Sequence, residues 1–105
     1  MATTAEQLTR IHDQIGAAAS AVSNDPGTSP VLGAVVQEFA KKARKAMEAL
    51  PGADDAALRA SILEVEQAGD SAKAAAEADD GPSDATRQAV LDAHLAICVL
   101  KAKTA

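Results

Sequence analysis

The chain has 105 residues, near the commonest size of a single domain, and we expect one domain over residues 1–105. A formal net charge of −5 and a pI near 4.8 argue against nucleic acid and anionic membrane as partners. Alanine supplies much of the apolar content and Phe39 is the only aromatic residue, which favours thin, closely packed helices over strands.

The sequence also indicates a compartment. The longest apolar run, residues 95–100, is far shorter than the roughly 20 residues that span a bilayer. The opening MATTAEQLTR lacks the basic and apolar segments of a secretory signal. Cys98 is the only cysteine, so no internal disulfide forms. We therefore expect a cytoplasmic protein with no membrane partner.

The first two predicted helices cover residues 4–23 and 30–50. Thr3 and Glu6 fit a capping box at the start of the first helix, and Ser29 is the expected cap of the second. Apolar residues then follow at three- and four-residue steps, which predicts one buried face per helix. These faces are Leu8, Ile11, Ile15, Ala18 and Val22 in the first helix, and Leu32, Val36, Phe39, Ala43, Ala46 and Leu50 in the second.

The other two predicted helices cover residues 54–79 and 83–103, with Ser83 as the cap of the last one. The apolar face of the third helix shrinks along its length from leucine and isoleucine to glycine and alanine. A glycine inside a helix costs about 1 kcal/mol relative to alanine. We therefore expect Gly69 to permit the close approach of another backbone.

Four helices with short links predict an all-α fold, an antiparallel up-down-up-down four-helix bundle that is alanine-rich and tightly packed. The alternative is a helical hairpin that completes its core only by dimerising. No internal repeat is apparent.

The last helix has a wider apolar surface than one buried face needs. Leu91, Leu95, Cys98 and Ala102 form one stripe, and Val90, Ala93, Ile97 and Leu100 form another. A line at seven-residue spacing, Arg87, His94 and Lys101, runs between them. A helix this apolar is usually buried on more than one side. We therefore expect Val90, Ala93, Ile97 and Leu100 to bind a protein partner or a second copy, and Cys98 to be inert packing.

The two histidines suggest an alternative function. In an antiparallel bundle His12 lies level with residue 96, so it comes near His94, and Glu64 and Glu66 lie at a similar height. Two imidazoles and a carboxylate are able to hold zinc or iron. The Glu-x-x-His spacing of di-iron bundles is absent, however, so we expect no metal or other cofactor, with His12, His94 and Glu64 as the candidate ligands of the alternative.

The stretch HDQIGAAAS, which begins at His12, resembles the phosphorylation motif of histidine phosphotransfer domains. In that family the histidine is followed by lysine at the third residue and glycine at the fourth. Gly16 matches, whereas Ile15 occupies the lysine position. The resemblance implies a four-helix bundle in which His12 accepts a phosphoryl group.

No sequence motif of catalysis is present: the chain has no glycine-rich phosphate loop, no Gly-x-Ser-x-Gly and no His-Glu-x-x-His. The cations at 41, 42, 44 and 45 fit a solvated helix face. We expect a protein that is not an enzyme but a small adaptor, chaperone-like or assembly module, self-associating through its last helix. Histidine-based signalling or metal binding through His12 and His94 is the alternative.

Overall fold

The computed structural model describes residues 2–104 and contains four helices in that range, with no strand. Each helix starts and ends within one residue of the predicted bounds. In chain order they are α1 (Thr4–Asn24), α2 (Pro30–Ala49), α3 (Asp55–Ala78) and α4 (Asp84–Thr104).

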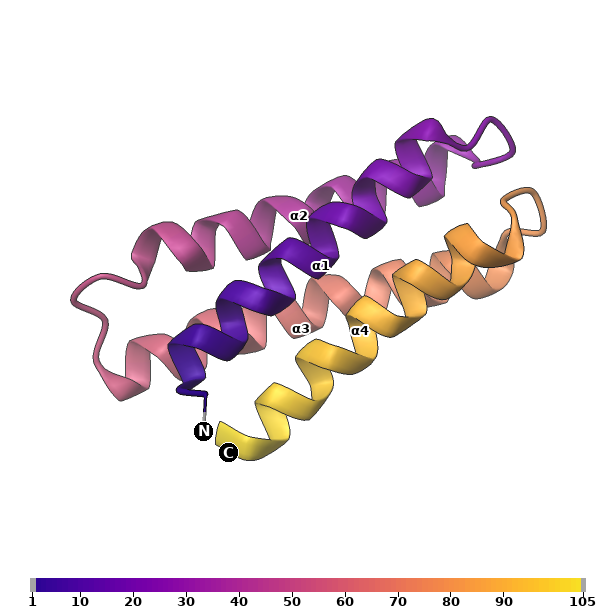
Figure 1. The fold of residues 1–105 in the computed structure, drawn as a ribbon. Coiled ribbons are helices and arrows are strands. Elements are labelled where there is room, and N and C mark those ends of the chain that lie inside the picture. The colour runs from indigo at the N-terminus through magenta and orange to yellow at the C-terminus, as the bar shows by residue number, and fades with distance from the viewer. Residues whose placement is uncertain (1, 105) are drawn as a thin grey trace.

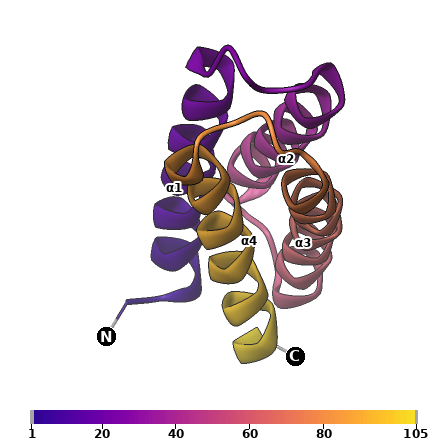
Figure 2. The ribbon, with the colours of Figure 1, turned by 90° about the vertical axis from the view of Figure 1, so that its right-hand side faces the viewer.

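The helices run alternately up and down, so the predicted four-helix bundle is confirmed (Figure 1). Each helix packs against its sequence neighbours, and α1 also packs against α4, which closes the ring. Figure 2 views the bundle obliquely from one end, with α1 and α3 on opposite sides of α4; α1 and α3, like α2 and α4, are not packed neighbours. None of the four described helices combines the length and apolar character that crossing a membrane requires.

The helix starts follow the predicted capping chemistry. The hydroxyl of Thr3 accepts from the Glu6 N–H at 3.1 Å, and the Glu6 carboxylate accepts from the Thr3 N–H at 3.2 Å. Ser29 and Ser83 each accept from a backbone N–H three residues later, both at 3.2 Å. Asp54 does the same for α3, at 2.8 Å. These side chains satisfy backbone donors that have no partner inside their helices.

Gly69 is buried, as predicted, but side chains rather than a backbone approach it. A Cβ added there would lie 3.1 Å from two ring carbons of Phe39 and 3.3 Å from a ring carbon of His94. The only aromatic ring of the protein, itself fully buried, therefore rests on the bare backbone of α3. The absence of a side chain at Gly69 is what lets both rings reach α3.

The bundle consists of two related hairpins, so the expectation that the chain has no repeat is wrong. Every buried position of α1 and α2 recurs in α3 and α4 at a constant spacing of 54 residues. The pairs are Leu8 with Ile62, Ile11 with Val65, Ile15 with Gly69, Ala18 with Ala72 and Val22 with Ala76; then Leu32 with Thr86, Val36 with Val90, Phe39 with Ala93, Ala43 with Ile97 and Ala46 with Leu100.

The two hairpin loops hold each other at one end of the bundle. Asp25 accepts from the Ser83 N–H and Asp79 accepts from the Ser29 N–H, both at 2.9 Å. Each carboxylate also accepts from the glycine N–H two residues further along its own loop, again at 2.9 Å. Hydrogen bonds from Ser83 and then Gly27 lower the pKa of Asp25, and those from Ser29 and then Gly81 lower the pKa of Asp79. Each loop thus accepts from the other the same kind of hydrogen bond that it gives, as expected for two repeated hairpins.

Candidate functional site

Arg87, His94 and Lys101, the polar line between the apolar stripes of α4, all face α3. Arg87 donates to the carbonyl oxygens of Ala76, at 3.1 Å, and Asp79, at 2.7 Å. The Lys101 ammonium lies 3.4 Å from the Glu66 carboxylate. His94 lies between these two contacts. The line predicted at seven-residue spacing is therefore one side of a polar seam between α3 and α4.

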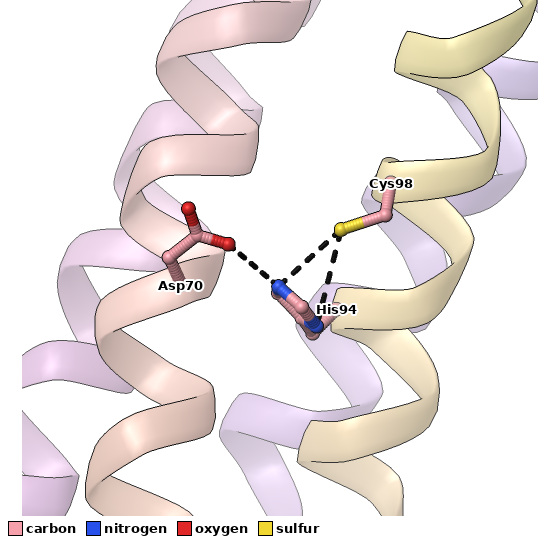
Figure 3. A group of neighbouring side chains, drawn as sticks. All are labelled: Asp70, His94 and Cys98. Atoms are coloured by element: carbon pink, nitrogen blue, oxygen red, sulfur yellow. Dashed lines mark hydrogen bonds and ion pairs between the residues drawn. The ribbon is translucent and has the colours of Figure 1, made fainter.

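The centre of this seam brings Asp70, His94 and Cys98 together (Figure 3). The His94 Nε2 lies 2.7 Å from the Asp70 Oδ1 and 3.3 Å from the Cys98 Sγ. The ligand atoms of the three side chains all lie within 4.8 Å of one another. A second carboxylate is adjacent, because the Cys98 thiol lies 3.9 Å from the Glu66 Oε2. We call Glu66, Asp70, His94 and Cys98 the α3–α4 cluster.

Helical periodicity explains the cluster. Glu66 and Asp70 are four residues apart on α3, and His94 and Cys98 are four residues apart on α4, so each pair occupies one helix face. The two faces meet because α3 and α4 are neighbours. Gly69 carries no side chain, which lets the His94 ring settle close to the backbone beside Asp70.

The geometry does not support nucleophilic catalysis by Cys98. In a catalytic triad the histidine uses one ring nitrogen for the acid and the other for the nucleophile. Here the shortest contacts of both Asp70 and Cys98 go to the same Nε2, while the Nδ1 is 4.0 Å from the sulfur. Burial, together with the Glu66 and Asp70 carboxylates, raises the pKa of the Cys98 thiol, which favours the protonated form.

The expected interaction residues of α4 are not available to a partner. Val90, Ala93 and Ile97 are 0% exposed and Leu100 is 2% exposed, all within the single chain. They are the fourth side of the bundle core and correspond in the repeat to Val36, Phe39, Ala43 and Ala46 of α2. The assignment of these four residues to an interface is therefore wrong, because the surrounding three helices cover them.

The apolar surface that remains uncovered on α4 belongs mainly to Leu95 and Val99. Their exposed fractions are 61% and 45%. They line a groove of about 480 Å³ between α1 and α4. Ile11 and Leu100 also line the groove; the polar residues that line it are Gln7, Arg10, Gln14, Asp92 and Lys103. This groove lies on the opposite flank of α4 from the α3–α4 cluster.

The structure does not bring His12, His94 and Glu64 together. The His12 Nδ1 contacts the Asp13 carboxylate at 3.3 Å, and Glu64 contacts Lys45 of α2 at 3.5 Å. Residues 10 and 14 of α1 line the groove with α4, so residue 12, about 200° away around the helix, points elsewhere. The proposed grouping fails because equal height in a bundle does not imply the same face.

The phosphotransfer resemblance gains no support from these contacts. Ile15, which occupies the position of the family's lysine, is 0% exposed in the core. Arg10, the nearest cation in sequence, lines the groove with α4 rather than the surroundings of His12.

The basic residues of α2 are largely paired. Lys42 lies 3.9 Å from Glu38, Arg44 lies 4.0 Å from Glu48, and Lys45 reaches Glu64. These are exposed or half-exposed ion pairs, which contribute little to stability. The prediction of a solvated face fits this arrangement.

Sequence reasoning missed Asp70, placed Glu66 only at the height of the two histidines, and treated Cys98 as core packing, whereas Cys98 is half-buried at the edge of the core. The available signal was the pair of four-residue spacings, Glu-x-x-x-Asp and His-x-x-x-Cys. No protein-family model matches the chain, and no curated protein or solved structure matches it significantly.

Proposed function

We propose that the protein is a small helical assembly module that self-associates through the outer face of α4. The observation that carries the proposal is a stripe of four residues, Asp92, Leu95, Val99 and Lys103, which follow one another at three- and four-residue steps. Its two central residues are the exposed apolar side chains of the α1–α4 groove. Its ends carry opposite charges. We call this set the outer stripe.

A second copy of the chain fits the outer stripe by charge complementarity. When two α4 helices pack antiparallel about a two-fold axis near residue 97, Leu95 of one copy faces Val99 of the other. The same operation places Asp92 of each copy beside Lys103 of the other. Both ends of the contact then join opposite charges, which favours this register over a parallel one.

The expected association is weak. Each copy contributes two aliphatic side chains and a polar rim, which is typical of a small, transient interface. The net charge of −5 on each copy adds repulsion that salt reduces. We place this module in a reducing compartment such as the cytoplasm, since Cys98 is a free thiol.

Sedimentation velocity over a concentration series up to the order of 1 mM tests the proposal, because weak complexes form only near their Kd. We expect concentration-dependent dimers for the wild type and monomers for Leu95→Glu. Val31→Glu is the matched control, since Val31 is 67% exposed on α2 and the charge change is identical. A wild type that stays monomeric throughout, or equal effects of both variants, would refute self-association through α4.

Charge reversal tests the register. Asp92→Lys alone puts two lysines together at each end of the dimer and should weaken it. Adding Lys103→Asp restores opposite charges at both ends and should recover the wild-type association. Failure of the double variant to recover, with dimers present in the wild type, would show that the copies meet in another orientation.

A further inference from the structure

We propose that Glu66, Asp70, His94 and Cys98 form a binding site for a divalent cation of the zinc type, which ties α3 to α4. The site is separate from the outer stripe and does not depend on self-association. Its four side chains offer one thiol sulfur, one imidazole nitrogen and two carboxylates, a set that suits zinc and cobalt and is unlike the all-oxygen sets that magnesium and calcium prefer.

The ligand atoms of Asp70, His94 and Cys98 are spaced much as in a tetrahedral site, whereas Glu66 lies outside this group and approaches it through the Cys98 thiol. Zinc–sulfur and zinc–nitrogen bonds of about 2.3 and 2.0 Å at a tetrahedral angle separate the two ligand atoms by about 3.5 Å. The Cys98 Sγ and His94 Nε2 lie 3.3 Å apart. The Asp70 Oδ1, at 2.7 Å from the same nitrogen, is in hydrogen-bond contact and has to move back by about half an ångström to share a metal. A side-chain rotation of this size leaves both helices in place.

The charges of the cluster favour a divalent cation. On binding, the Cys98 S–H bond breaks, a metal–sulfur bond forms and the proton passes to the buffer. The thiolate and two carboxylates then carry three negative charges beside a neutral imidazole. A divalent ion leaves one negative charge uncompensated. The Lys101 ammonium, 3.4 Å from Glu66, supplies a positive charge beside the cluster. In the metal-free state the polar contacts of these carboxylates are with Lys101, His94 and the Cys98 thiol.

The side chains are held in place but reachable from solvent. His94 and Glu66 are mostly buried, with side chains 14% and 13% exposed, whereas the Asp70 side chain is 57% exposed. Two ligands therefore have few alternative positions, and one side of the cluster faces the solvent through which an ion enters. Restricted ligands on rigid helices are what a selective metal site needs.

The repeat supplies a comparison within the same chain. The positions equivalent to Glu66, Asp70, His94 and Cys98 on the α1–α2 side are His12, Gly16, Ala40 and Arg44. That set offers a single ligand and a cation. The bundle therefore does not require polar residues at this seam, and the ligand set belongs to one hairpin alone.

Cobalt(II) alone, titrated into the reduced wild-type protein, tests the proposal, because a cobalt–thiolate bond produces a near-ultraviolet charge-transfer band and tetrahedral cobalt absorbs strongly in the visible. We expect both signals to saturate at one cobalt per chain and to disappear when zinc is added, but not when magnesium is added. Cys98→Ser should remove the near-ultraviolet band. Calorimetry with zinc should show at least about tenfold weaker binding for Glu66→Gln and Asp70→Asn. Removing a residue that only hydrogen-bonds to a metal ligand already weakens metal binding by about tenfold or more.

His12→Ala and Glu64→Gln are the matched controls, since they remove the other histidine and a neighbouring acid of α3. Both should bind zinc as the wild type does, and Leu95→Glu should also bind it, which separates this site from the outer stripe. Circular dichroism establishes that each variant is folded. A folded wild type without the thiolate band, a band that persists in Cys98→Ser, or equal losses in His12→Ala and His94→Gln would overturn the proposal.

Discussion

Replacing Gly69 with alanine should destabilise the protein, although the same change elsewhere in its helices should stabilise it. Alanine gains about 1 kcal/mol over glycine inside a helix. At Gly69 the new methyl group would meet two carbons of the Phe39 ring at 3.1 Å and a carbon of the His94 ring at 3.3 Å. Phe39 is fully buried in the core, so its ring has little room to retreat.

The expected change in the free energy of unfolding is the sum of the helix-propensity gain and the packing cost. Overpacking a close-packed core by one methyl group costs about 1–3 kcal/mol. Subtracting the helix gain leaves a net loss of about 0–2 kcal/mol, and we expect about 1 kcal/mol. At Gly16 no atom lies within 4 Å of the added methyl group, so only the gain of about 1 kcal/mol remains. The two variants should therefore differ by about 2 kcal/mol in free energy of unfolding.

Urea denaturation monitored by circular dichroism measures both variants, with equal m-values showing that only stability has changed. Phe39→Leu supplies a double-mutant cycle: without the ring, Gly69→Ala should lose most of its penalty, because the contact that opposes the methyl group is gone. If Gly69→Ala stabilises the protein as much as Gly16→Ala does, or if Phe39→Leu leaves its effect unchanged, the ring contact is not what selects glycine there.

Three further predictions concern the helix ends and loops. Because hydrogen bonds lower the pKa of Asp25 and Asp79, their stabilisation is present above the ordinary aspartate pKa of about 3.9 and is lost as the pH falls through the lower folded pKa. Unfolding free energies measured from neutral to acidic pH should therefore fall less steeply in Asp25→Asn with Asp79→Asn than in the wild type, and equal slopes would contradict the loop assignment. Gly27→Ala should destabilise the protein by about 1–3 kcal/mol in thermal unfolding, because the new methyl group would overlap the Gly81 carbonyl; wild-type stability would mean that the loops separate freely. Thr3→Ala should lose about 1 kcal/mol by removing the capping box of α1, with Thr9→Ala as an exposed control, and equal losses would argue against the cap.

The sequence predicted the helices well because their signals are local. Caps at Thr3, Ser29 and Ser83 and apolar residues at three- and four-residue steps are properties of single segments. The assignment of stripes on α4 failed because it depends on neighbours: Val90 and Leu95 are both apolar, and only the placement of α1 and α3 decides which one is covered.

The repeat was not detected in the sequence because equivalent core residues of the two hairpins differ in size. Phe39 corresponds to Ala93, Ile15 to Gly69, and Ala43 to Ile97, so a large residue in one hairpin is matched by a small one in the other. Such pairs look unrelated when the halves are aligned. The α3–α4 cluster escaped for a similar reason, since its ligands come from two helices and become neighbours only through packing.

Because both hairpins lie on one polypeptide, their sequences are free to differ, unlike those of two identical hairpins in a symmetric dimer. In a symmetric pair each substitution is made twice, so a residue suited to one side is imposed on the other as well. Here the Phe39 ring occurs once and is met by a single glycine, while Cys98 and His94 have arginine and alanine at the equivalent places of the other hairpin. Covalent linkage thus permits specialisation: one half alone carries the Phe39 ring, while the other alone gathers the polar ligands of the α3–α4 cluster.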